Sequence, residues 1–151
     1  MSTTSRIAAA QDGLLAAIAA QQAGPGSPLA GVQLALGHPI DLQAEAVWVA
    51  DDASSDQAHA ATSQPGSEDR GETIELQAKC FVVRGELDYK TARDRALALA
   101  GEVEDAVRAD RSLGGAVFDA ETQGLDLESG VDGENRLVGV TVRIRSTAYL
   151  S

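Results

Sequence analysis

A strict alternation of hydrophobic and polar residues runs through the middle of the chain, from Glu72 to Arg84. Because successive side chains of a β-strand point to opposite faces, a period of two predicts a strand with one buried face. The residues expected to be buried are Ile74, Leu76, Ala78, Cys80 and Val82, and those expected on the opposite face include Thr73, Glu75, Gln77, Lys79 and Phe81.

The pattern changes directly after this strand. Gly85 and Asp88 mark a turn, and the following segment as far as Asp110 has hydrophobic residues at helical spacing. A period of 3.6 indicates an amphipathic helix with one apolar stripe. That stripe comprises Tyr89, Ala92, Ala96, Leu99, Val103 and Val107. The helix therefore has a face that can pack on the strand before it.

The first third of the chain predicts a helix and two strands. The helix runs from about Thr4 to Gln22, with Thr4 or Ser5 as its cap, because a hydroxyl oxygen can accept an unpaired N–H of the first turn. Two alternating runs follow, Val32–Leu36 and Leu42–Val49. The short turn between them, Gly37-His38-Pro39, suggests that they form a hairpin.

The stretch from Asp51 to Gly71 has no apolar periodicity. It is acidic and rich in residues that favour turns, so we expect a long exposed loop. A loop of about twenty residues is unusual inside a compact domain, and such loops are often functional. Two interpretations stay open: a mobile or partner-contacting loop, and a passive insertion.

The last third predicts a second strand pair. Ser112–Gly115 forms a turn, and an extended stretch runs from Ala116 through Leu125 and Leu127. Asp132-Gly133 is a strong hairpin signal. The final strand, Arg136 to about Tyr149, is expected to point its apolar residues inward and its arginines outward. The inward set is Val138, Val140, Val142 and Ile144, and the outward set is Gly139, Thr141, Arg143 and Arg145.

Together these elements predict a single α+β domain over residues 1–151, with an exposed loop at 51–71. Hairpin-joined strands combined with two helices favour an antiparallel or mixed β-sheet of four to five strands. Both helices are expected on one face of that sheet.

Composition narrows the function. Hydrophobic residues make up 44% of the 151, which excludes a disordered chain. The net charge of −11 argues against tight binding of a nucleic-acid backbone, which needs clustered cations. A single cysteine, Cys80, provides neither a disulfide framework nor a zinc site. Neither a secretory signal nor a membrane span is visible, so we expect a protein made in the cytoplasm.

The search for chemistry finds no catalytic motif. The phosphate-binding, dinucleotide-binding and nucleophile-elbow signatures are absent from the sequence. His38 and His59 lie in expected turns or loops. The acidic groups at Asp51–Asp56 and at the hairpin tip around Asp132 read as solvated carboxylates. We therefore expect no catalytic residue, no cofactor and no metal.

Charged and apolar residues on the outward strand faces and at the strand-to-helix junction are candidates for a subunit or partner interface. One alternative is that these cations simply pair with the chain's many carboxylates. The other is an interface, because arginine is enriched there and exposed apolar patches mark partner contacts. Val47 and Val49 are expected on the same exposed face. The candidate residues are Glu75, Lys79, Phe81, Val83, Arg84, Lys90, Arg93, Arg143 and Arg145.

The order of elements resembles that of the tail terminator proteins of long-tailed bacteriophages, also called tail completion or minor tail protein U-like proteins. The resemblance covers nearly the whole chain. It rests on the strand Glu72–Val83, the segment Asp88–Ala96 that opens the central helix, and the turn Asp110-Arg111-Ser112-Leu113-Gly114-Gly115 that follows this helix. The turn is its most specific part.

The resemblance implies a structural role. Such proteins form a hexameric ring on the head-proximal end of the tail tube, stop its growth and contact the head-completion protein, while DNA passes through the lumen. The partners implied are further copies of the chain, the tail tube protein and a head-completion or neck protein, within the virion and away from any membrane. Two alternatives stay open: a head-to-tail connector or neck ring protein, and a small-molecule-binding α+β domain.

Overall fold

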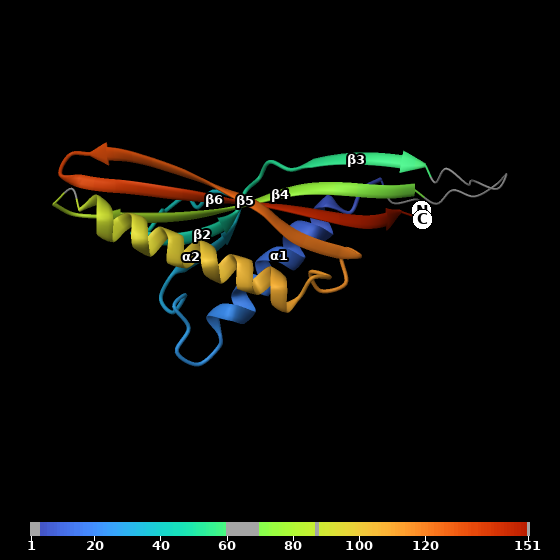
Figure 1. Cartoon of the computed structure of the whole chain (residues 1–151), viewed down its shortest axis with the longest axis horizontal. Coiled ribbons are helices and arrows are strands. Elements are labelled where there is room, and N and C mark those ends of the chain that lie inside the picture. The colour runs from blue at the N-terminus through green and yellow to red at the C-terminus, as the bar shows by residue number, and fades with distance from the viewer. Residues whose placement is uncertain (1–3, 60–69, 87, 151) are drawn as a thin grey trace.

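The structure, a computed structural model, describes residues 4–59, 70–86 and 88–150. It contains two helices and six strands (Figure 1). In chain order they are α1 (Ile7–Gln22), β1 (Gln33–Leu36), β2 (Glu45–Val49), β3 (Ser54–His59), β4 (Arg70–Arg84), α2 (Tyr89–Ala109), β5 (Asp119–Asp132) and β6 (Asn135–Leu150).

All six strands belong to one mixed sheet with the order β1-β2-β4-β6-β5, and β3 pairs with β4 beside β2. The long central strand β4 pairs with β6 along its full length, while β2 and β3 share its other side. Both helices lie on one face of the sheet (Figure 1). The predicted α+β class, with a mixed sheet and two helices on one face, is confirmed.

The core lies between the sheet and the helices. The inward residues predicted for β4 and β6 are all buried, and so is the predicted stripe of α2 except Tyr89, which packs at its margin. The side chain of Asp88 caps α2 by accepting the N–H of Thr91 at 3.1 Å. Burying each Leu, Ile or Val contributes about 1.5–3 kcal/mol, so this face decides the fold.

The predicted hairpin between the first two strands is wrong, because β1 and β2 run parallel. The chain returns through residues 37–44, beginning at Gly37, which has a φ of 78°. Eight extended residues reach about 26 Å, enough to run back along a strand of four residues. This return covers Trp48 on the outer face, since the rings of His38 and Trp48 lie 5.0 Å apart in an edge-on contact. A tight hairpin would leave that indole uncovered.

The predicted loop 51–71 contains a strand. β3 pairs antiparallel with Arg70–Glu75, which adds a sixth strand and extends β4 by two residues at its start. Residues 60–69, also in the predicted loop, lie outside the described part. β3 is polar and has no apolar alternation, so it is held by main-chain pairing and by polar contacts of Ser55 and Gln57. Hydrophobic periodicity cannot detect such a strand.

Val47 and Val49 lie on the face opposite to the predicted one. Both are fully buried under the helices, whereas Ala46 and Trp48 point to the outer side. The pairing of Val47 with Cys80 and of Val49 with Ala78 explains this, because paired residues share a face. The predicted exposed apolar patch is therefore reduced to Phe81 and Val83, which are half-buried.

The turn after α2 is built tightly against α1. The Asp110 carboxylate accepts the N–H of Gly114 at 2.8 Å and the hydroxyl of Ser112 at 2.8 Å. These hydrogen bonds, that from Ser112 first, lower the pKa of Asp110. Leu113 is buried with a φ of 48°, a left-handed conformation that side chains rarely adopt. Its carbonyl lies so close to Gly13 of α1 that a Cβ there would stand 2.0 Å from the oxygen.

Candidate functional site

The outer face of the sheet carries most of the predicted interface residues. Strand pairing places side chains in rows across β4, β6 and β5, and residues in one row share a face. One row joins Glu75, Arg145 and Glu121, so an exposed guanidinium lies between two carboxylates. The predicted residues on this face are Glu75, Lys79, Phe81 and Val83 of β4 and Arg143 and Arg145 of β6.

Arg143 lies flat across β5 at a bulge. Its guanidinium covers Gly124, where an added Cβ would stand 2.6 Å from Nη2, and its Nε is 3.2 Å from an Asp126 oxygen. In the neighbouring row, Lys79 Nζ donates to the hydroxyl of Thr141 at 2.9 Å. Both cations are thus held on the outer face by polar contacts with neighbouring strands.

An aromatic chain borders this charged area. The ring of Phe81 lies 6.4 Å from that of Trp48, which in turn contacts His38. Phe81 also pairs across the sheet with Gly139, whose lack of a side chain leaves the ring partly open. The outer face thus combines an apolar corner with mixed charges. That combination is typical of protein contact surfaces.

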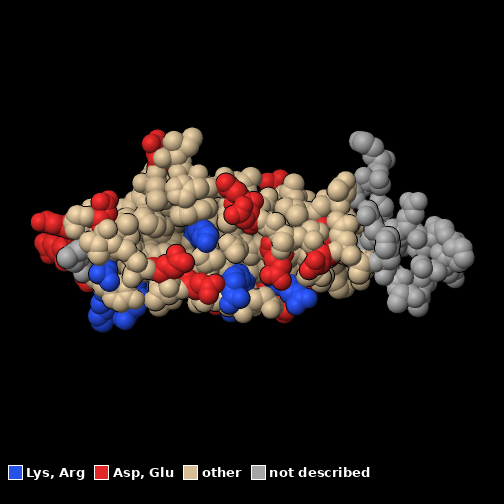
Figure 2. Space-filling model, turned by 90° about the horizontal axis from the view of Figure 1, so that it is seen from above, with Lys and Arg blue, Asp and Glu red and all other residues tan. Residues whose placement is uncertain are grey.

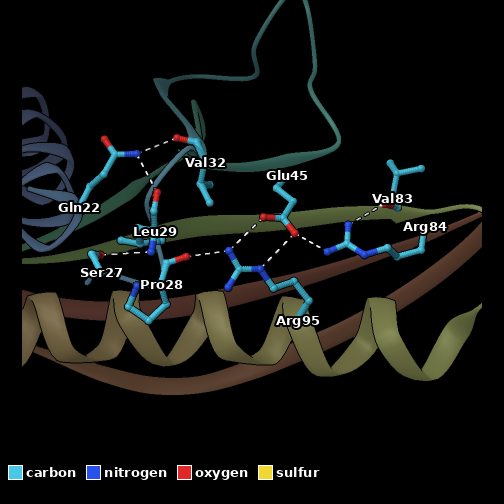
Figure 3. A network of polar contacts seen from close by, with 9 residues as sticks. All are labelled: Gln22, Ser27, Pro28, Leu29, Val32, Glu45, Val83, Arg84 and Arg95. Atoms are coloured by element: carbon cyan, nitrogen blue, oxygen red, sulfur yellow. Dashed lines mark hydrogen bonds and ion pairs between the residues drawn. The ribbon is translucent and has the colours of Figure 1, made fainter. Parts of the chain in front are cut away.

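Arg84 lies on the other side of the sheet and serves the fold. Arg84 and Arg95 both form ion pairs with Glu45 of β2, and Arg95 also donates to the carbonyl of Pro28 at 2.6 Å (Figure 3). The hydrogen bond from Arg95, opposed by burial and aided by Arg84, lowers the pKa of Glu45. These two arginines therefore pair with a carboxylate of the same chain, which is the first of the two alternatives given above.

The remaining predicted residues, Lys90 and Arg93, lie on α2. Arg93 donates to Asp94 at 2.9 Å, and its guanidinium is 5.8 Å from the ring of Tyr89. Arg136 covers the same ring at 4.9 Å. The structure therefore splits the nine predicted residues into six on the outer face and three on the helix side, which do not form one continuous surface.

A buried carboxylate at the other end of the sheet was missed from the sequence. Glu72 is 2% exposed and accepts the hydroxyls of Ser5 and Ser55 at 2.5 Å each and the N–H of Arg6 at 2.7 Å. Burial raises the pKa of Glu72, but these hydrogen bonds outweigh it, so its pKa lies below the usual range. Glu72 thereby joins the start of α1 to β3 and β4. The sequence shows that Glu72 alternates with Ile74, but it does not indicate which distant groups bind the Glu72 carboxylate.

The described residues offer little for catalysis. Cys80 is fully buried, and burial raises the pKa of its thiol to about 12, far from a reactive thiolate. Within the described ranges, no three His, Cys, Asp or Glu side chains gather to hold a metal ion. None of the described helices has the length and apolar character needed to cross a membrane.

Exposed hydrophobic side chains at two opposite sheet edges form a second feature missed from the sequence. Nine large hydrophobic side chains are exposed among the described residues, and seven of them lie at these edges. Leu36, Ile40 and Leu42 lie on and after edge strand β1. Leu97 of α2 and Leu125, Leu127 and Val131 of edge strand β5 lie at the other edge. Leu125, Leu127 and Val131 are exposed because α2 packs over β4 and β6 and leaves much of β5 uncovered, which periodicity does not indicate.

Comparison with known proteins identifies the fold. Neither a protein-family model nor a curated protein sequence matches the chain. Among solved structures, the chain is similar to one in the virion of a native gene transfer agent particle, with a TM-score of 0.55 and 18% sequence identity. The match covers 89% of this chain and 95% of the other. At this identity the likeness establishes a shared fold over nearly the whole domain.

Proposed function

We propose that this chain is a structural protein of a phage-like virion, and within that class a tail terminator. In this role a hexameric ring of the chain caps the head-proximal end of the tail tube and stops its growth. The ring also joins the tail to a head-completion protein and lets DNA pass. Assembly takes place in the host cytoplasm before the protein becomes part of the virion tail.

The observation that carries this proposal is the likeness to a chain of a virion particle, which covers almost all of both chains. The resemblance in element order and at the 110–115 turn adds to it, and this turn is a compact structure packed against α1. The net charge of −11 is compatible with a lumen that does not retain DNA.

Native mass spectrometry of the protein, alone and mixed with purified tail tubes, tests the proposal. We expect a hexamer, or a monomer that becomes a six-fold cap on tubes. A twelve-fold ring would instead support a connector or neck protein. A protein that remains monomeric and ignores the tubes would overturn the virion-ring proposal.

The outer face is the proposed contact surface for a neighbouring virion protein. Arg145→Glu replaces an exposed cation on this face with an acid between two carboxylates. We expect it to lose binding to tail tubes while the ring mass stays unchanged, and we expect Arg145→Lys to retain both. If Arg145→Glu caps tubes as well as wild type, the outer face does not face the tube.

A further inference from the structure

The two long edges of the sheet differ in chemistry. At the β5 edge, pairing with inward residues of β6 places Leu125, Leu127 and Val131 on the helix side. Their exposed fractions are 41%, 45% and 56%. The acidic residues Asp126 and Glu128 pair with Thr141 and Gly139, so they point to the outer face. The helix side of this edge is therefore apolar.

The neighbouring flank of α2 continues this apolar strip and adds one exposed cation. A cleft between the end of α2 and β5 is lined by Glu104 and Arg108 together with Thr122. Leu97 precedes Glu104 by seven residues, about two helical turns, so it lies on the same flank. Lys90 stands a further seven residues back and is exposed. Arg108 is ion-paired with Asp105 at 2.8 Å and with Glu104 at 3.8 Å, so its charge is balanced within the helix. We call Lys90, Leu97, Leu125, Leu127 and Val131 the β5-edge surface.

The opposite edge has the same apolar character but lacks positive charge. The β1-edge surface consists of Leu36 on the helix side and of Ile40, Asp41 and Leu42 in the return segment, which lies toward the outer face at this edge. Ile40 is fully exposed. The sequence contains no Lys or Arg between residues 7 and 69. In Figure 2 no Lys or Arg is visible along one long edge, whereas cations lie from the middle of the face to the other long edge, interspersed with Asp and Glu.

This asymmetry determines which contacts between copies are favourable. A symmetric contact between two β1-edge surfaces would bring only apolar groups and anions together, and like charges repel. A contact between the β1-edge surface of one copy and the β5-edge surface of the next brings these apolar groups and Asp41 against leucines and the ammonium group of Lys90. Because the two surfaces differ and lie at opposite edges, repeating this head-to-tail contact generates a ring when the rotation closes.

We propose that the β5-edge surface of one copy docks on the β1-edge surface of the next, and that this contact builds the ring. The proposal rests on the proposed ring function and specifies its subunit interface. It leaves the outer face of β4 and β6 free for a neighbouring virion protein.

Two half-blocked variants test the proposal. Leu127→Asp blocks the β5-edge surface and Ile40→Asp blocks the β1-edge surface. Both side chains are exposed, so both variants are expected to fold, which thermal unfolding checks against wild type. Native mass spectrometry should show no ring for either alone, with association weakened roughly 10-fold or more. An equal mixture should form 1:1 dimers, because only one intact pair of surfaces remains.

Tyr149→Asp is the matched control, since Tyr149 is 72% exposed but outside both surfaces, and it should form rings. Rings formed by both half-blocked variants would overturn the edge contact and leave the ring function standing. A symmetric dimer of either variant alone would also overturn it, in favour of a two-fold contact. If wild type forms no ring, alone or on tubes, both this inference and the proposed function fail.

Discussion

Two glutamates hold the helices to opposite ends of the sheet by different means. Glu45 binds the two arginines Arg84 and Arg95, and its side chain is 22% exposed. Glu72 is buried and receives hydrogen bonds from neutral hydroxyls and a main-chain N–H at the start of α1. The first end is charged and partly wet, whereas the second is dry and close-packed. Disruption of the dry end should therefore reduce the free energy of unfolding more, because water cannot take the place of a hydrogen-bond partner that is lost there.

The largest effect is expected at Gly13, where α1 meets the turn of the dry end. Gly13→Ala places a Cβ 2.0 Å from the main-chain oxygen of Leu113, and rigid backbone must move to make room. We expect a loss of about 3 kcal/mol in the free energy of unfolding, measured by urea titration. Gly101→Ala is the control, because Gly101 is also helical but has nothing within 4 Å. It should gain about 0.5–1 kcal/mol. Equal effects of the two substitutions would mean that the contact at Gly13 is not close.

The next effect is expected at Glu72. Glu72→Ala leaves the Ser5 and Ser55 hydroxyls and the Arg6 N–H without their acceptor, so we expect a loss of about 2–3 kcal/mol in the free energy of unfolding. Glu72→Gln keeps one acceptor oxygen and should lose less. Denaturant unfolding of both variants provides the measurement. A Glu72→Ala variant as stable as wild type would show that this end is held by packing alone.

The contrast also explains what could be predicted from the sequence. β4, α2 and β6 carry unbroken periodicity, so their positions and buried faces were clear before the structure was known. The direction of β1 could not be predicted, because it depends on how the return segment covers Trp48. No local sequence pattern indicates that contact. The partners of Glu45 and Glu72 come from distant elements, so pattern alone could not pair them. Alternation placed six of the candidate residues on the outer face, but it does not indicate what covers that face, so their role in a contact stays a prediction.

A smaller effect is expected at the charged end. Glu45→Gln leaves Arg84 and Arg95 without a counter-charge, although both guanidiniums reach water with side-chain exposures of 30% and 26%. We expect a loss of about 1–2 kcal/mol, less than for Glu72→Ala. Thermal and urea unfolding measure it. A loss larger than that of Glu72→Ala would reverse the ranking of the two ends.

Acid should weaken both ends. Because the pKa of Glu45 and that of Glu72 are lowered in the folded state, the unfolded chain binds protons more readily. The stability they contribute is complete above the unfolded glutamate pKa of about 4.3 and is lost as pH falls through the lower folded values. Unfolding midpoints measured from pH 7 to pH 3 should decrease as the pH passes through this window. The fall should be less steep in Glu72→Gln, and an unchanged slope would show that Glu72 does not titrate with unfolding.

Salt provides the finest separation between the two ends. The Debye length shortens from about 10 Å at 0.1 M to about 3 Å at 1 M, so the attraction of the partly exposed Glu45 to its arginines is screened. The contacts of Glu72 are short hydrogen bonds from neutral groups in a buried site, and screening leaves them almost unchanged. The stability difference between wild type and Glu45→Gln should therefore shrink by a few tenths of a kcal/mol in 1 M NaCl. The difference between wild type and Glu72→Gln should stay constant, because general effects of salt on unfolding cancel in each comparison. If both stability differences shrink equally, Glu72 also depends on an attraction between charges that salt can screen. The distinction between a charged end and a dry end would then not hold.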